Sequence, residues 1–326
     1  MKAFNAERTI NSQLKFVFML FWLVTLVLML QRGEPNTIIN LHPWLGGITE
    51  TTQELSFVWI VVTRLLFIAG STMLLWLISV RNLDLPRKGY MLFFILPVIH
   101  FTITDWSIGL SVSVYWTAFL FILYQLLPGD NTTPVLRKTL TAAILSGILL
   151  LNGAFAILFF VTGIITMIIS QDISFRRIIV WLAGFLTPAF FAFLWYFLTD
   201  QTSIILDNPG AFVLEEELLQ FAFPATFYGC PALLILLSLF AHSRMGESKI
   251  SVRRSYSVIL FSLIGLAPAM LTSLFNIYIL FSIYGLATVF YWVRLMYNAR
   301  SKVAFIILWL MPVAFPVLYY YLLNYK

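Results

Sequence analysis

Residues 140–170 read LTAAILSGILLLNGAFAILFFVTGIITMIIS and carry no charged residue from end to end. An upright membrane-spanning helix needs about 20 apolar residues, so this run is too long for one such helix and short for two. The charges that follow it decide between the two interpretations. A single helix would place the basic pair at 176–177 outside and the acidic residues 215–217 inside, although basic residues prefer the inner side of a membrane. The run is therefore predicted to be a helical hairpin that turns near Asn152.

The composition of the whole chain favours the same environment. Of 326 residues, 61% are hydrophobic and only 10% are charged, and the mean hydropathy is +0.93. A soluble domain carries roughly 25% charged residues. We therefore expect an all-α fold, a polytopic membrane helix bundle that forms a single integral membrane domain over residues 1–326.

About eleven spans are predicted once the 140–170 run is divided. They lie near 14–31, 57–80, 90–104, 107–127, 140–154, 156–170, 178–198, 225–241, 256–273, 277–293 and 303–323.

The charge pattern predicts that the N-terminus lies inside and the C-terminus outside. With this orientation every one of the 20 Lys and Arg residues falls on the inner side except Arg32, Arg64 and Lys326. Such a bias is the known signature of membrane topology. The basic pI of about 9.4 is thus explained by topology, and a nucleic-acid partner is not expected.

Several classes of chemistry have no support in the sequence. The single cysteine, Cys230, excludes an intrachain disulfide and a cysteine-rich metal site. The predicted inner loops are too short for a kinase or ATPase domain, and no phosphate-binding glycine loop occurs. We expect no metal and no cofactor.

Arg64 is the exception within the apolar stretch FVWIVVTRLLFIAG, residues 57–70. A charged residue inside a span costs about 2.5–3.5 kcal/mol on insertion scales, so such residues usually have a partner or a role. At roughly 10 Å below the outer surface, the guanidinium can reach the headgroups, form a structural ion pair, or bind an anion. The sequence leaves these three alternatives open.

Three further polar residues fall in the outer half of the membrane in the same topology: His100, Asp105 and Asn152. Each has a structural interpretation, since Asp105 can cap the next helix, Asn152 can serve the turn, and His100 can be a buried histidine. Considered with Arg64, they also form a candidate site. Arg64 and Asn152 would bind a lipid phosphate, and Asp105 or a glutamate of an outer loop would act as a general base, with His100 as a further catalytic candidate.

Residues 172–200, DISFRRIIVWLAGFLTPAFFAFLWYFLTD, together with SVRRSYSVILFSL and LMYNARSKVAFIILWL, carry a resemblance to a known family. The chain resembles uncharacterised polytopic inner-membrane proteins of bacteria that share a domain of unknown function. The resemblance implies a multi-pass protein of the bacterial inner (plasma) membrane and supplies no catalytic residues. Members sometimes carry the label carotene monooxygenase, an activity that needs four histidine ligands for iron, whereas this chain has three histidines.

Three classes of function remain open at this stage. The first is an enzyme or carrier that handles a lipid-linked envelope glycan or a phospholipid headgroup at the outer leaflet. The second is a non-catalytic subunit or assembly factor of a cell-envelope complex, and the third is a transporter or flippase. The expected partners are membrane lipids, with a polyprenyl-phosphate-linked substrate for the first class and other envelope proteins for the second.

Overall fold

The computed structural model describes residues 57–85, 106–127, 134–151, 156–170, 173–203, 225–243 and 249–266, and scattered residues between 287 and 306. Within these ranges the secondary structure is helical, and no described residue lies in a β-strand. The all-α prediction is confirmed for this part of the chain. The predicted spans at 14–31 and 90–104 lie outside the described residues.

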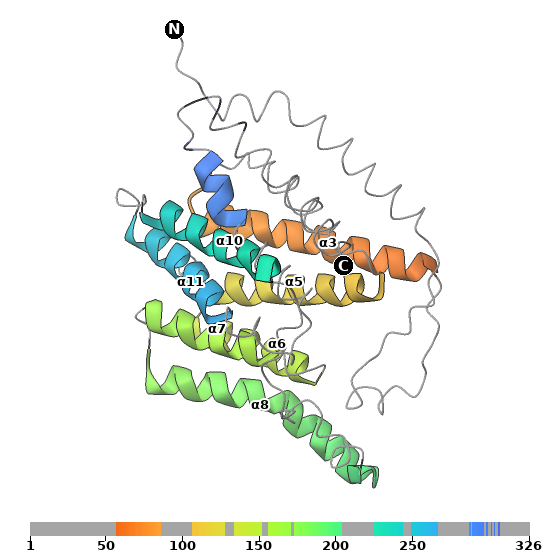
Figure 1. Ribbon diagram of the computed structural model, residues 1–326. Coiled ribbons are helices and arrows are strands. Elements are labelled where there is room, and N and C mark those ends of the chain that lie inside the picture. Colours follow the sequence, from red (N-terminus) through yellow and green to blue (C-terminus); the bar gives the residue numbers. More distant parts are fainter. Residues whose placement is uncertain are drawn as a thin grey trace.

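Seven helices have defined bounds in the described part of the chain. They are α3 (Phe57–Arg81), α5 (Trp106–Leu126), α6 (Val135–Leu150), α7 (Ala156–Ile169), α8 (Phe175–Leu198), α10 (Ala225–Ser243) and α11 (Ile250–Leu266). A shorter helical segment covers residues 289–296 and is coloured blue in Figure 1. The long apolar run 140–170 is divided between α6 and α7, which is the division that the charge pattern predicts.

The helices pack side by side in a bundle (Figure 1). Helix α3 lies along α5, α5 contacts both α6 and α7, and α6 packs against α7 and α8. Helix α11 joins the bundle through α7 and α10. The core therefore runs from the α3–α5 pair through α6 and α7, with α8 on one side and α10–α11 on the other.

The α3–α5 contact combines apolar packing with hydroxyl pairs. Ile68 of α3 and Trp116 of α5 are almost fully buried. The Thr117 hydroxyl donates to the carbonyl of Phe67 (3.2 Å), so Ser71 is the donor in the 2.7 Å bond between the Ser71 and Thr117 hydroxyls. Small hydroxyl residues that bond between helices are typical of helix packing within membranes.

The α6–α8 contact depends on a close approach of the two backbones. A Cβ atom on Gly147 would overlap the carbonyl oxygen of Phe185 and would lie 2.9 Å from Cδ of Pro188. In the neighbouring helix α7, a Cβ on Gly163 would overlap the ring of Trp181, which is 1% exposed. Only glycine fits at these two positions, because any side chain would occupy space that α8 already fills.

Helix α8 differs from the other described helices in its exposure. It contains 24 residues, is apolar enough to cross a membrane, and has only 22% of its most apolar window buried in the bundle. Shorter apolar stretches lie at Leu66–Arg81, Val114–Leu126 and Ile157–Ile169. Figure 1 shows that α8 bends along its length and that its second half diverges from α6 and α7, while Ala192 and Tyr196 on that half remain buried. Pro188 inside the helix explains the bend, because proline cannot donate a backbone hydrogen bond and clashes with the preceding turn.

Candidate functional site

Of the predicted outer-half residues, the structure describes only the backbone of Arg64, which lies on α3. His100, Asp105 and Asn152 lie outside the described residues. The described part of α5 begins at Trp106, so the N-cap interpretation of Asp105 stays a prediction. Whether the four residues lie close together therefore stays a prediction.

The position of Arg64 on α3 nevertheless carries information. Ile68, Ser71, Leu75 and Ile78 form the stripe of α3 that is buried in the bundle. An α-helix has 3.6 residues per turn, so positions at intervals of three, four and seven share one face. Position 64 falls on the line of this stripe, one turn before Ile68.

Apart from Arg64, the basic residues of the described part of the chain gather at one end of the bundle, which we call the basic end. Its members are Arg81, Arg137, Lys138, Arg176, Arg177, Lys249, Arg253, Arg254 and Arg294. Hydrogen bonds, an ion pair and a shared cavity join the end of α3 to the end of α5 and to the starts of α6 and α11. Another bond joins the starts of α6 and α8.

A partly open cavity of about 380 Å³ lies within the basic end. It is lined by Arg81 and Asn82 at the end of α3, by Tyr124 and Gln125 in the last turn of α5, and by Arg137, Lys138 and Thr141 near the start of α6. Three of these side chains are cationic, and none of the described lining residues is acidic. The cavity therefore has the composition of an anion site.

Hydrogen bonds hold the walls of the cavity in place. Arg81 donates from Nη1 to the Tyr124 hydroxyl at 2.5 Å, and its guanidinium carbon lies 5.9 Å from the centre of that ring. Asn82 donates from Nδ2 to the carbonyl of Leu127 at 3.4 Å, which ties the ends of α3 and α5 together. On the opposite wall, the first turn of α6 adds the positive end of a helix dipole.

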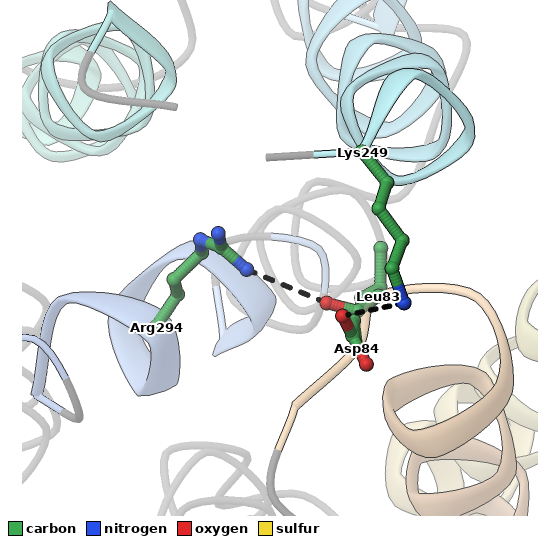
Figure 2. A network of polar contacts seen from close by, with 4 residues as sticks. All are labelled: Leu83, Asp84, Lys249 and Arg294. Carbon is green, nitrogen blue, oxygen red and sulfur yellow. Dashed lines mark hydrogen bonds and ion pairs between the residues drawn. The ribbon is translucent and has the colours of Figure 1, made fainter. Parts of the chain in front are cut away.

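The loop after α3 also contacts the far side of the basic end (Figure 2). Figure 2 shows Lys249 and Arg294 approaching the same short segment, Leu83–Asp84, from two different helices. Lys249 pairs with the Asp84 carboxylate at 3.4 Å, and Arg294 donates to the carbonyl of Leu83 at 3.4 Å. Asp84 has a positive φ of 50°, a conformation that aspartate tolerates better than most residues. The segment therefore links α3, α11 and residues 289–296.

Next to this segment, His242 at the end of α10 contacts two hydroxyl groups. Its Nδ1 lies 3.3 Å from the Tyr291 hydroxyl, and its Nε2 lies 3.4 Å from the Ser257 hydroxyl. The Tyr291 hydroxyl donates to the carbonyl of Tyr256 at 2.6 Å, so Nδ1 must carry the proton that joins His242 to Tyr291. Burial lowers the pKa of His242, which favours a neutral ring at pH 7. The Ser257 hydroxyl likewise donates to the carbonyl of Arg253 at 3.0 Å, so a neutral ring can donate to only one of the two hydroxyl groups at a time.

Arg177 is the buried cation of the basic end. It is 4% exposed, lies in the first turn of α8, and donates from Nε to the Thr139 hydroxyl of α6 at 2.9 Å. Its own backbone N–H donates to the Ser174 hydroxyl, which caps α8. Arg177 thus joins the starts of α6 and α8 and faces away from open solvent.

No group of three or more His, Cys, Asp or Glu residues within the described ranges is arranged to hold a metal ion. No protein family, curated protein or solved structure matches the chain. The family resemblance of residues 172–200 therefore stays a prediction, and the chemistry of the site has to be argued from its own residues.

Sequence reasoning treated Arg81, Arg137 and Lys138 only as indicators of topology and did not foresee that they line one cavity. The sequence did contain one indication of this cavity. The predicted topology places all three residues on the inner side, and each lies within a few residues of the end of a predicted span. What the sequence lacked was the order in which the helices pack. That order follows from interhelical contacts such as the one between α5 and α6.

Proposed function

We propose that the chain is a multi-spanning protein of the bacterial inner membrane. Helix α8 supports this proposal, because large apolar side chains cover most of its surface and remain exposed on the bundle. They include Ile178, Ile179, Leu182, Leu186, Phe190, Phe191, Phe193, Trp195, Phe197 and Leu198. A helix of 24 residues is about 36 Å long and exceeds the roughly 30 Å hydrocarbon thickness. In water such a surface would be an aggregation hazard, whereas in lipid it is the expected exterior.

The orientation follows from the basic end. Positively charged residues accumulate on the cytoplasmic side of inner-membrane proteins. The nine residues of the basic end lie in loops and at helix ends. Along the chain, these basic segments alternate with helix ends at the opposite surface of the bundle. We therefore propose eleven spans, with the basic end and the N-terminus inside and the C-terminus outside.

With this orientation, we propose that the protein binds a lipid-linked phosphate in the outer half of the membrane. The substrate would be a lipid-linked envelope glycan or a phospholipid headgroup. The observation that carries this function is the register of Arg64 on the buried stripe of α3. An arginine at that depth and on that face needs an oxygen partner, because a desolvated guanidinium without one is strongly destabilising. Its forked geometry suits a phosphate, and Asn152 would add an amide, with Asp105 or His100 as the general base.

The test is to replace Arg64 by leucine and to measure the phosphate-bearing lipid that purifies with the protein in mild detergent. Wild-type protein should retain such a lipid in a fixed ratio, and Arg64→Leu should fold but lose it. Arg253→Leu, which removes an exposed arginine of α11 at the other end, should retain the lipid and serves as the control.

Two results would contradict the proposal. A folded Arg64→Leu protein that keeps the same lipid at the same ratio would show that the residue only reaches the headgroups. A wild-type protein without bound lipid, together with an Arg64→Leu variant of lower melting temperature, would identify a structural ion pair instead.

The second candidate function is that of a non-catalytic subunit of an envelope complex. One observation favours it: the second half of α8 diverges from α6 and α7 and exposes Phe190, Phe191, Trp195 and Phe197. Aromatic side chains of this kind are enriched in protein interfaces. A stable complex recovered from membranes by crosslinking from this half of α8, with no lipid lost in Arg64→Leu, would favour the subunit over the lipid-binding protein.

A further inference from the structure

We propose that the cavity of the basic end is a binding site for a phosphate group, carried by the headgroup of an anionic lipid in the inner leaflet. The site is distinct from the proposed function at Arg64, because it lies at the opposite end of α3. The inference rests on the proposed orientation of the bundle, but the two binding sites concern different leaflets, and binding at either one can fail without the other.

The first argument is the charge and geometry of the lining. Arg81, Arg137 and Lys138 come from the ends of two helices that only the fold brings together. Arginine can bond a phosphate with two parallel N–H groups, and lysine adds a point charge. The Tyr124 hydroxyl already accepts a bond from Arg81 and can donate its own proton to an anion. The lining thus offers several donors to one guest oxyanion.

The second argument is the size and position of the cavity. Its volume of about 380 Å³ lies near the lower end of the roughly 300–1,000 Å³ range of small-ligand sites, which suits a headgroup and excludes a whole lipid. Basic pockets between helices on the cytoplasmic side of membrane proteins commonly hold anionic headgroups. With the basic end inside, this cavity opens at the depth where such headgroups lie.

The third argument concerns the source of the phosphate. On the same two turns of α6 that line the cavity, Val135 and Leu140 are 48% and 41% exposed. They lie on other faces of α6 than the one that lines the cavity, and they place the first two turns of α6 at a level that acyl chains can reach. A headgroup at that level is held there by its own acyl chains, whereas a free phosphate ion has no such anchor, so we argue for a lipid.

The experiment compares wild-type protein with Arg137→Gln and with the double variant Arg137→Gln/Lys138→Gln. Both positions are exposed or half-buried, so folding should survive, and gel filtration checks it. Arg176→Gln and Arg253→Gln remove exposed arginines of the same end outside the cavity and serve as matched controls. Binding is measured by native mass spectrometry in detergent with added phosphatidylglycerol, phosphatidic acid or phosphatidylcholine, and by thermal shift with inorganic phosphate.

Wild-type protein and both controls should retain phosphatidylglycerol and phosphatidic acid over phosphatidylcholine. The loss of one charge-assisted phosphate contact should weaken that binding about tenfold, and the double variant should weaken it further. Inorganic phosphate could stabilise the wild type in a way that depends on Arg137 while the lipids do not bind. That result would confirm a phosphate site but overturn the lipid as its source. Equal lipid and phosphate binding by wild type and the double variant, or an equal loss in the two controls, would overturn the site.

Discussion

Arg176 and Arg177 are neighbours on one turn of α8, yet the fold gives them different roles. Arg176 is exposed, whereas Arg177 is 4% exposed and donates to the Thr139 hydroxyl at 2.9 Å. A buried cation without partners is destabilising, so its bonds to the fold have to compensate for the lost hydration. Substituting each residue in turn therefore distinguishes a charge that stabilises the fold from a charge that affects only the orientation of the protein in the membrane.

We predict that Arg177→Met lowers the free energy of unfolding by about 1.5–3 kcal/mol, the range for a hydrogen bond that involves a charged group. Arg176→Met should change it by no more than about 0.5 kcal/mol, as is usual at exposed positions. Unfolding in a mild detergent by titration with a denaturing one, followed by circular dichroism, measures both. Equal stability of the two variants would mean that the Arg177–Thr139 bond contributes nothing.

At this scale the sequence predicts less than the structure shows. The basic pair in the first turn of α8 is visible in the sequence and indicates the inner side, but both residues give the same signal. Burial of one of them depends on the direction in which position 177 points from α8 and on the presence of α6 beside it. Thr139 is 38 residues away in the chain, and no local pattern links it to Arg177.

At the scale of elements, the pair α6–α8 shows how the bundle gains its tightest contact. Gly147 faces the carbonyl of Phe185 and the ring of Pro188, so the two helix backbones meet without side chains between them. Small residues at such crossings let helices approach closely, and van der Waals packing then stabilises the pair even where lipid removes the hydrophobic effect.

We predict that Gly147→Leu separates α6 from α8 and lowers the melting temperature of the detergent-purified protein, with a cost of at least about 1–3 kcal/mol from overpacking. Ala183→Leu is the control, because it adds the same kind of side chain to an exposed position of α8. Its melting temperature should stay near that of the wild type. A Gly147→Leu protein as stable as the control would show that the close approach is not required.

The boundaries of the elements show why hydropathy alone is an incomplete guide. Spans were predicted to begin at 140, 178 and 256, whereas α6, α8 and α11 begin at Val135, Phe175 and Ile250. Hydropathy detects where a chain is apolar, but a helix begins where its first N–H groups find acceptors, as Ser174 provides for α8. The polar first turn of α6 belongs to the helix and carries Arg137 and Lys138, so these two cations of the cavity fell outside the predicted spans.

At the scale of the whole molecule, the alternation of charge along the chain becomes a single charged end in space. Arg81, Arg137 and Lys249 lie in separate segments of the sequence, and contacts of the loop after α3, the cavity and the Asp84–Lys249 pair bring them together. The sequence predicted this gathering from the topology, without the packing order of the helices. It could not predict the cavity, because a cavity is set by the distances between helices.

The alternation of charge along the chain also predicts which side of the membrane each loop occupies. Reporters fused after Leu85 and after Ser243 should report the cytoplasm, while reporters after Asp200 and after Lys326 should report the outer compartment. The physical reason is that basic loops resist transfer across the membrane, and Arg81 and Lys249 flank the first two positions. Asp200 follows the exposed apolar length of α8, which would have to cross the bilayer between the basic end and this fusion site. A cytoplasmic reporter after Asp200 would mean that α8 does not cross the membrane. A cytoplasmic reporter after Lys326 would mean that the number of spans is even, and the eleven-span proposal would then be wrong.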